Sequence, residues 1–250
     1  MSAPSYREFK PAPHLQPFIA AYWLSEGYYA EKVLFPIFAD GCCDIIFDIA
    51  ANSPAKMVGT GVNLEYVPLK GKVRLGGIRF LPGGFTALTG IPADRIYDGT
   101  DAEDMLNSKI VEGLKRINDG FSPSALDAVF GSCVSCRNPM MSFWLSSQDS
   151  DVKGIASYFG CSVKTVSRTF LHHTGATPSK MLSVKRFQHS LKMVVRGGSN
   201  YTEIAYEAGY YDQSHFIKDF KKYSGSTPSD FLRYKNSLGV RFIQFPTGCI

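Results

Sequence analysis

The chain has 250 residues, of which 44% are apolar and 20% are charged, a composition that predicts a folded protein with one large domain or two of ordinary size. It holds no apolar run of about 18 residues, and MSAPSYREFK at its start lacks the features of a signal peptide, so we expect a cytoplasmic protein without membrane contact. The formal net charge is +5, yet residues 151–236 carry 13 Lys and Arg against 6 Asp and Glu, and the remainder carries 14 against 16. The excess positive charge lies in the C-terminal third, which favours contact of that part with a polyanion.

Residues 15–80 consist of short apolar runs divided by Gly, Pro, Asn and Asp, a pattern that predicts β-strands. The runs cover residues 18–24, 32–38, 43–50, 56–62 and 72–80. Asp40, Asp44 and Asp48 lie around the third run. We interpret them as polar residues at strand ends and not as a catalytic carboxylate pair.

Beyond the last of these runs the pattern becomes helical. Thr100 and Asp101 are N-cap candidates for a helix over TDAEDMLNSKIVEGLKRI, in which acids come early and bases late, as the helix dipole favours. A second helix is predicted over residues 122–130, with Ser122 as its cap and Pro123 in its first turn.

The cysteines and histidines do not form a metal-binding pattern. The six cysteines are too sparse for a disulfide framework, so we expect reduced thiols. Cys133 and Cys136 form a C-x-x-C pair at the expected domain junction, and two thiols do not complete a tetrahedral metal site, which leaves a redox pair as the alternative. His14 is the only histidine before residue 172, and His172 and His173 are predicted to be exposed turn residues. We expect no metal and no cofactor.

A repeat dominates the C-terminal third. FLHHTGATP at 170–178 returns as FKKYSGSTP at 220–228, and an Ile-Ala step followed by a glycine precedes each copy, with Gly160 in the first and Gly209 in the second. The apolar spacing in each unit predicts two short amphipathic helices, and the glycine suits a left-handed residue between them. Each unit therefore has the pattern of a helix-turn-helix motif.

The residues that start the predicted helices are typical N-caps. Ser162 and Asp212 precede the second helix of each unit. Thr177 and Pro178 begin a long helix that ends at Gly197, about 18 residues and roughly 27 Å in length. This helix would be a rigid spacer between the two units.

Residues 138–235 resemble the DNA-binding domain of AraC/XylS-type transcription regulators, which has seven helices and two helix-turn-helix motifs joined by a linker helix. The resemblance is carried by IASYFGCSVKTVSRTFLHHTGATPSKML, KRFQHSLKMV and EIAYEAGYYDQSHFIKDFKKYSGSTPSDF. Tyr210 replaces a commoner Phe, and Ser190 stands where Ala is usual, so its hydroxyl needs a carbonyl partner.

This resemblance implies a double-stranded DNA partner, with each recognition helix in one major groove. It places Lys164, Thr165, Ser167 and Arg168 of the first helix, and Gln213, Ser214, His215 and Lys218 of the second, at the DNA. Arg168 is suited to guanine and Gln213 to adenine. The alternative for each of the eight is a solvated helix surface or a phosphate contact.

FPIFADGCCDIIFDI, KMVGT and LGGIRFLPGGFTALTGIPADRI, within residues 13–106, resemble the N-terminal sensor-like domain of one subgroup of these regulators, a small cupin-like β-barrel followed by helices. The resemblance implies a role in binding a small-molecule effector or in forming a homodimer, and RNA polymerase as a further partner. Tyr22, Trp23, Phe35 and Phe47 would line the barrel if it is hollow, or fill a packed core.

The predicted fold class is therefore α+β with two domains, a β-barrel-like domain with helices and an all-α domain with two helix-turn-helix motifs. The expected ranges are 1–135 for the regulatory domain, 136–236 for the DNA-binding domain and 237–250 for a C-terminal tail that packs on the body. The predicted function is sequence-specific transcription regulation, without enzyme activity. Two alternatives stay open: a methyl acceptor of the DNA alkylation-repair type that uses Cys42 or Cys43, and an interaction module that no longer binds DNA.

Overall fold

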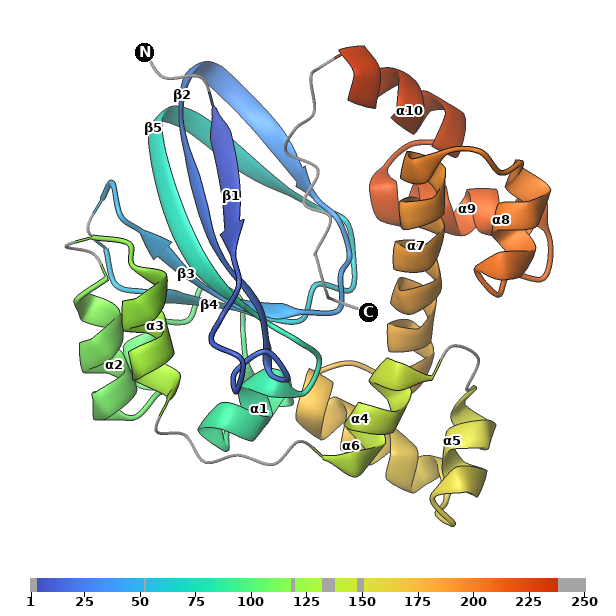
Figure 1. The fold of residues 1–250 in the computed structure, drawn as a ribbon, viewed down its shortest axis with the longest axis horizontal. Helices are drawn as coiled ribbons and strands as arrows, with labels where there is room; N and C mark the ends of the chain where they lie inside the picture. Colours follow the sequence, from blue (N-terminus) through green and yellow to red (C-terminus); the bar gives the residue numbers. More distant parts are fainter. Residues whose placement is uncertain (1–3, 52, 118–119, 132–137, 148–150, 238–250) are drawn as a thin grey trace.

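Two long antiparallel strands form the centre of the N-terminal domain. The computed structural model describes residues 4–51, 53–117, 120–131, 138–147 and 151–237. The five strands are β1 (Ser5–Phe9), β2 (Ile19–Ile37), β3 (Cys43–Asp48), β4 (Lys56–Val58) and β5 (Glu65–Phe80). They form one antiparallel sheet in the order β1-β2-β5-β3-β4, which curves strongly along β2 and β5 (Figure 1). This sheet is the β-rich domain that the sequence predicts.

The predicted break between the strands at 18–24 and 32–38 is wrong, because β2 runs through it. Ser25 pairs with Leu75 and Tyr29 with Gly71, so the polar segment between the two apolar runs stays hydrogen-bonded to β5. The register shifts at two places, between Ile19 and Ala21 and between Tyr29 and Val33. The neighbouring long strand β5 supplies hydrogen-bond partners for the backbone of this segment, whose side chains give little indication of a strand.

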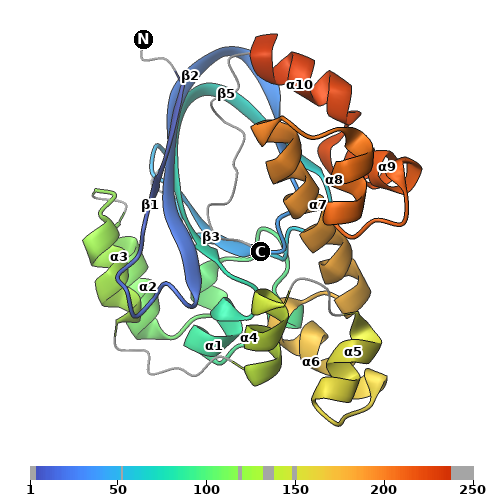
Figure 2. The same cartoon turned by 45° about the vertical axis from the view of Figure 1, so that its right-hand side comes forward.

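One face of the sheet packs on helices (Figure 2). These are α1 (Gly84–Thr89), α2 (Ser108–Lys115) and α3 (Pro123–Phe130), with two 3₁₀ turns, η1 (Ala93–Arg95) and η2 (Ala102–Asp104). Asp127 of α3 accepts hydrogen bonds from the Tyr22 hydroxyl and the Ala12 amide, both at 2.9 Å, and ties the helices to the sheet. The apolar core of this domain lies between the two layers.

The first predicted helix begins later than the sequence suggests. Thr100 and Asp101 do not cap it: Asp101 precedes the short η2 turn without a side-chain cap bond, and α2 begins only at Ser108. Asn107 is the cap, and its side chain accepts a hydrogen bond of 3.0 Å from the Ile110 amide. The helix predicted over 122–130 is confirmed, with Ser122 as its cap.

The C-terminal domain consists of helices in the predicted order. They are α4 (Pro139–Ser146), α5 (Val152–Tyr158), α6 (Val163–Thr174), α7 (Pro178–Arg196), α8 (Tyr201–Glu207), α9 (Gln213–Ser224) and α10 (Pro228–Ser237). Gly160 and Gly209 have φ values of 58° and 79°, so both turns use the left-handed region, as predicted. The two helix-turn-helix units, α5–α6 and α8–α9, lie at opposite ends of α7 (Figure 1).

Several sequence-based expectations concern residues outside these ranges. Cys133, Cys136, the boundary between 135 and 136, and the tail from residue 238 onward all lie there. The expectation of reduced thiols is wrong for Cys42, which is disulfide-bonded, while Cys43 and Cys161 are free. Within the ranges that the structure describes, no helix combines the length and apolar character needed to span a bilayer.

The position of the α2 cap gives a direct test. We expect Asn107→Ala to lower the free energy of unfolding by about 1 kcal/mol, because the Ile110 amide loses its acceptor. Thr100→Ala is the matched control and should change it by less than about 0.5 kcal/mol. Urea unfolding of both variants measures the difference, and an equal loss in the two would contradict the cap assignment.

Candidate nucleic-acid interface

The first helix-turn-helix unit buries one side of α6 and leaves the other to solvent. Val166 and Phe170 are fully buried in a cluster with Ile155 of α5 and Trp144 of α4. The Ser162 hydroxyl accepts a hydrogen bond of 3.1 Å from the Thr165 amide and starts the helix. Lys164 and Arg168 are exposed, and Thr165 and Ser167 are half-buried beside them.

The second unit repeats this arrangement on α9. Phe216 and Phe220 are buried against Ile204 and Ala205 of α8. Asp212 caps the helix by accepting a hydrogen bond of 2.7 Å from the His215 amide. The four predicted contact residues, Gln213, Ser214, His215 and Lys218, are all exposed.

Neighbouring side chains orient part of the second face. The Thr202 hydroxyl donates to Gln213 Oε1 at 2.9 Å, which fixes the amide at the start of α9. His215 Nε2 lies 3.8 Å from Asp219 Oδ2, and its ring meets the edge of Tyr210 at a centroid distance of 5.1 Å. Tyr210 itself is buried, and the uncommon Ser190 donates to the Phe187 carbonyl at 2.8 Å, as its burial requires.

The eight predicted residues therefore form two separate faces, one on α6 and one on α9. The structure brings together the four members of each set but not the two sets, because the 19 residues of α7 separate them. At 1.5 Å per residue this helix is about 28 Å long. Base contact by each residue stays a prediction.

The N-terminal domain touches both α6 and α7. Thr60 Oγ1 donates to the Thr174 carbonyl, and Thr86 Oγ1 lies 3.4 Å from the carbonyls of His172 and His173. These contacts hold the C-terminal end of α6 and leave its N-terminal half open. The prediction that both histidines are exposed is wrong for His173, which is half-buried at this contact.

Loop 38–42 makes the contact with the linker helix. Gln188 of α7 is buried, and its Nε2 donates to the Ala39 carbonyl at 2.5 Å. Ala39 belongs to the same apolar cluster as Phe187 and Leu191. Nearby, Lys180 Nζ donates to Asn63 Oδ1 at 2.9 Å. We call loops 38–42 and 59–63 the joint, because both lie between the sheet and the C-terminal domain.

A cavity of about 250 Å³ lies on the face of the sheet opposite the helical core. Its walls include Trp23 and Phe35, whereas Tyr22 and Phe47 point to the other face and fill the packed core. The four aromatic residues singled out in the sequence are thus divided between a cavity wall and a core. Alternation along β2 sends Tyr22 and Trp23 to opposite sides.

Arg79 forms the charged floor of this cavity. Its side chain is only 4% exposed and is ringed by acids from three different segments. The Nη1 atom is 3.3 Å from Glu8 Oε1, and the Nε atom is 3.3 Å from Asp40 Oδ2 and 3.6 Å from Asp44 Oδ2. Asp44 also accepts a hydrogen bond of 2.7 Å from the Trp23 indole, and Asp40 accepts one of 2.9 Å from the Cys42 amide. The interpretation of Asp40 and Asp44 as ordinary strand-end residues missed this cluster.

Burial sets the protonation of the cluster. Burial raises the pKa of Asp40 to about 7, although the Arg79 charge acts against it, and it raises the pKa of Asp44 in the same way. Burial alone would lower the pKa of Arg79, but the charges of Asp44 and Asp40 raise it, so the guanidinium stays charged. Burial and the adjacent carboxylates also raise the pKa of the Cys43 thiol, which keeps it protonated.

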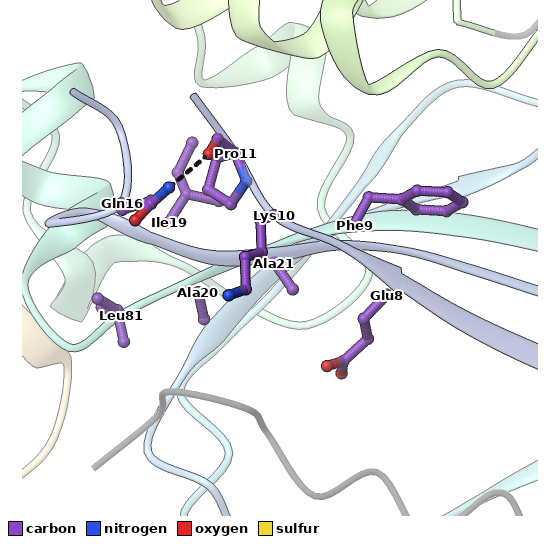
Figure 3. Close-up of a pocket in the computed structure, with 9 residues that line it drawn as sticks. All are labelled: Glu8, Phe9, Lys10, Pro11, Gln16, Ile19, Ala20, Ala21 and Leu81. Atoms are coloured by element: carbon purple, nitrogen blue, oxygen red, sulfur yellow. Dashed lines mark hydrogen bonds between the residues drawn. The ribbon is translucent and has the colours of Figure 1, made fainter. Parts of the chain in front are cut away.

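A second, larger pocket of about 420 Å³ lies beside the start of β2. Figure 3 shows its lining, in which the Gln16 amide donates to the Pro11 carbonyl at 3.0 Å and the charged groups are Glu8 and Lys10. Glu8 is already paired with Arg79. Across the ranges with described coordinates, no group of three or more His, Cys, Asp or Glu residues has an arrangement that would hold a metal ion.

Comparison with known proteins gives matches for both parts of the chain. Residues 155–234 match a family model described as a helix-turn-helix domain, and residues 7–100 match one described as a domain of unknown function. The HTH-type transcriptional activator RhaS of Salmonella arizonae is 28% identical over 86 residues, which cover 34% of this chain and 31% of RhaS, and RhaS of Salmonella newport matches equally. The match thus spans about a third of the length of these curated relatives.

Two of the solved structures that are similar to this chain have low sequence identity to it. The DNA-binding domain of AdpA, in complex with a target DNA, is 21% identical and covers 39% of this chain and 90% of its own, with a TM-score of 0.36. ToxT from Vibrio cholerae is 10% identical and covers 92% of this chain and 98% of its own, with a TM-score of 0.44.

The raised pKa of Asp40 predicts how one substitution changes stability with pH. Between pH 4 and 7 the unfolded chain releases the Asp40 proton while the folded protein keeps it, so this residue makes the wild type less stable as the pH rises. Asp40→Asn removes that loss. We expect the stability of the variant relative to the wild type to increase by more than about 1 kcal/mol from pH 4 to pH 7. Urea unfolding at each pH measures it, and a constant difference would show that the Arg79 charge outweighs burial.

Proposed function

We propose that this chain, whose residues 155–234 form a helix-turn-helix domain of the AraC/XylS type, is a sequence-specific DNA-binding transcription regulator. The observation that carries the proposal is the pair of exposed polar faces on α6 and α9, held at opposite ends of one stiff helix. Two such faces on one chain suit two successive major grooves on the same side of a duplex.

The proposed roles of the eight residues follow from their chemistry. Arg168 is exposed and presents a planar fork that matches guanine O6 and N7. Gln213 is held by Thr202 and keeps its amide donors for adenine N7, while its oxygen still has a second lone pair for adenine N6. Lys164 and Lys218 supply positive charge to base edges or phosphates, and the hydroxyls and imidazole complete the faces, contributed by Thr165, Ser167, Ser214 and His215.

The N-terminal domain is proposed to regulate the DNA-binding domain. The hydrogen bonds to α6 and α7 support this role, since any change in the joint reaches the linker helix directly. We propose a small-molecule effector or homodimer formation as the control, RNA polymerase as the partner at promoters, and the cytoplasm as the location. The division into residues 1–135, 136–236 and 237–250 belongs to the same proposal.

The alternative of a methyl acceptor has little chemical support. Such a reaction needs an accessible thiolate, but Cys43 is 7% exposed and burial raises the pKa of its thiol. Cys42 is disulfide-bonded. The interaction-module alternative is tested by the DNA-binding experiments below.

Substitution of the two residues suited to base edges tests the faces. We expect Arg168→Ala and Gln213→Ala each to weaken binding to a selected DNA site by about 1 to 3 kcal/mol and to relax specificity at one position of that site. The site is obtained by selecting bound fragments from random DNA with the wild-type protein, and affinities are measured by fluorescence anisotropy.

Lys153→Ala is the matched control, because Lys153 is exposed on α5, outside both recognition faces. It should leave sequence preference unchanged. Unchanged preference after replacement of both Arg168 and Gln213 would exclude these two as the base-reading residues.

Salt dependence separates the residues that bind phosphates from those that read bases. Affinity should fall steeply as salt is raised, because Lys and Arg displace counterions from DNA. Substitution of a lysine that neutralises one phosphate, such as Lys218→Gln, should reduce the slope of log affinity against log salt by about 1. The slope is measured between about 50 and 200 mM salt, and a salt-independent affinity would contradict electrostatic binding to DNA.

A further inference from the structure

The cavity on the sheet has the charge balance of a site for a cation. Among the side chains that line it are four carboxylates, from Asp40, Asp44, Glu65 and Asp98, and one guanidinium, from Arg79. With all five groups ionised the excess is three negative charges, and protonation of Asp40 and Asp44, whose pKa values burial raises, lowers it. Arg79 is already ringed by three acids, Glu8 included, so it is poorly placed to attract a further anion.

The walls have the chemistry that organic cations prefer. Trp23 and Tyr6 form a stacked pair with ring centroids 6.2 Å apart, and Tyr29 and Phe35 of β2 also line the cavity. Aromatic faces attract ammonium groups through the ring quadrupole and provide apolar surface for the rest of a ligand. A volume of about 250 Å³ lies just below the usual range for ligand pockets, about 300 to 1,000 Å³, which restricts the occupant to a small molecule.

The cavity also borders the joint. Asp40 lines it with its side chain, while the preceding residue, Ala39, accepts the hydrogen bond from Gln188 of α7. The amides of Asp40 and Gly41 both donate to the Gly61 carbonyl at 2.9 Å, so the two loops of the joint move together. Gln188 Oε1 is buried without a hydrogen-bond partner in the described part of the chain, which leaves this amide only half satisfied.

We propose that this cavity binds a small organic cation, a primary amine with an aromatic or aliphatic body, and that its occupancy is transmitted to α7 through the Ala39–Gln188 hydrogen bond. The inference rests on the proposed function, for which it names the class of effector and the route of control. An ammonium group beside Asp40 and Asp44 replaces the repulsion between buried carboxylates with attraction. This attraction pulls Asp40 toward the ligand, and with it the loop that contains Ala39. Because binding and DNA affinity are coupled in both directions, DNA should change amine affinity by the same factor.

The ligand class is tested on the unaltered full-length protein. Matched series of 2-phenylethylamine, 2-phenylethanol and 3-phenylpropanoate, and of hexylamine, hexanol and hexanoate, are titrated by calorimetry and by tryptophan fluorescence, to which Trp23 in the cavity wall and Trp144 in the helical core both contribute. In at least one series we expect the amine to bind about tenfold or more tightly than the alcohol, and the carboxylate to bind most weakly. Equal binding of the three, tightest binding of a carboxylate, or no binding of either amine would overturn the assignment.

A pair of variants on one strand locates the site. Asp44→Asn keeps an acceptor for the Trp23 indole and should lose about tenfold or more in amine affinity. Asp48→Asn, on the same strand and outside the cavity lining, should bind the amine as the wild type does. Thermal unfolding verifies that both variants are folded, and equal affinities for the amine in the two variants would overturn the location.

The route is tested by Gln188→Met and by Ser190→Ala as its control on the same buried helix. In the wild type, saturation with the amine that binds best should change affinity for the selected DNA site by about 5-fold or more. Gln188→Met should keep amine affinity within about twofold and lose most of that change. Ser190→Ala, whose hydroxyl donates to the Phe187 carbonyl and makes no contact with the joint that the structure records, should keep the change. A full response in Gln188→Met would overturn the route.

The two proposals fail in different measurements. Absence of any sequence-specific DNA binding would overturn the proposed function, while calorimetry would still decide whether the cavity binds amines. Normal DNA binding without amine binding would leave the regulator proposal standing and would remove the cation site.

Discussion

Helix α7 is shared between two hydrophobic cores, and the arrangement of the C-terminal domain depends on this sharing. Met181, near its start, is buried with α4, α5 and α6, whereas Phe187, Leu191 and Val194 are buried with α8, α9 and α10. Complete burial of each such side chain is worth about 1.5 to 3 kcal/mol. Neither recognition helix can rotate about α7 without exposing part of a hydrophobic core. The distance and relative orientation of the two exposed faces are therefore set by the fold, independently of DNA.

The contacts between the domains are of another kind. They combine single polar bonds, such as those of Gln188 with Ala39, Lys180 with Asn63 and Thr60 with Thr174, with apolar contacts from the two loops of the joint. In loop 38–42, Phe38 packs on Phe231, and in loop 59–63, Val62 packs on both cores of the C-terminal domain. A polar bond at such a contact can be exchanged for water at a net cost of about 1 kcal/mol. Movement of the sheet against α7 is therefore cheaper than movement within either core, and a ligand of modest affinity is sufficient to bias it.

The helical domain was predictable from sequence because its signals are local. Caps, the glycine turns and the spacing of Val166 and Phe170 all act within one helix or one turn, and each is found as predicted. What the sequence did not reveal depends on distant partners. The long strand β2 needs β5 beside it, and α2 takes its cap from Asn107 and not from the earlier candidate Thr100. The ring of acids around Arg79 comes from two strands and a loop. The one local signal of this charged cluster is Arg79 itself, in the apolar run GGIRF, at a position where a strand normally places a core residue.

That cluster is also the least expected feature on grounds of stability. A buried group of ionised side chains seldom stabilises a fold more than apolar residues of similar size, because each charge loses its hydration. Here the desolvation cost is higher because three acids surround one guanidinium. The raised pKa values of Asp40 and Asp44 reflect this cost. If stability were the only requirement, aliphatic residues at these positions would give the domain a higher free energy of unfolding. Placement of the excess charge at the wall of a cavity, next to the loop that holds α7, is what a site poised for a positively charged ligand requires.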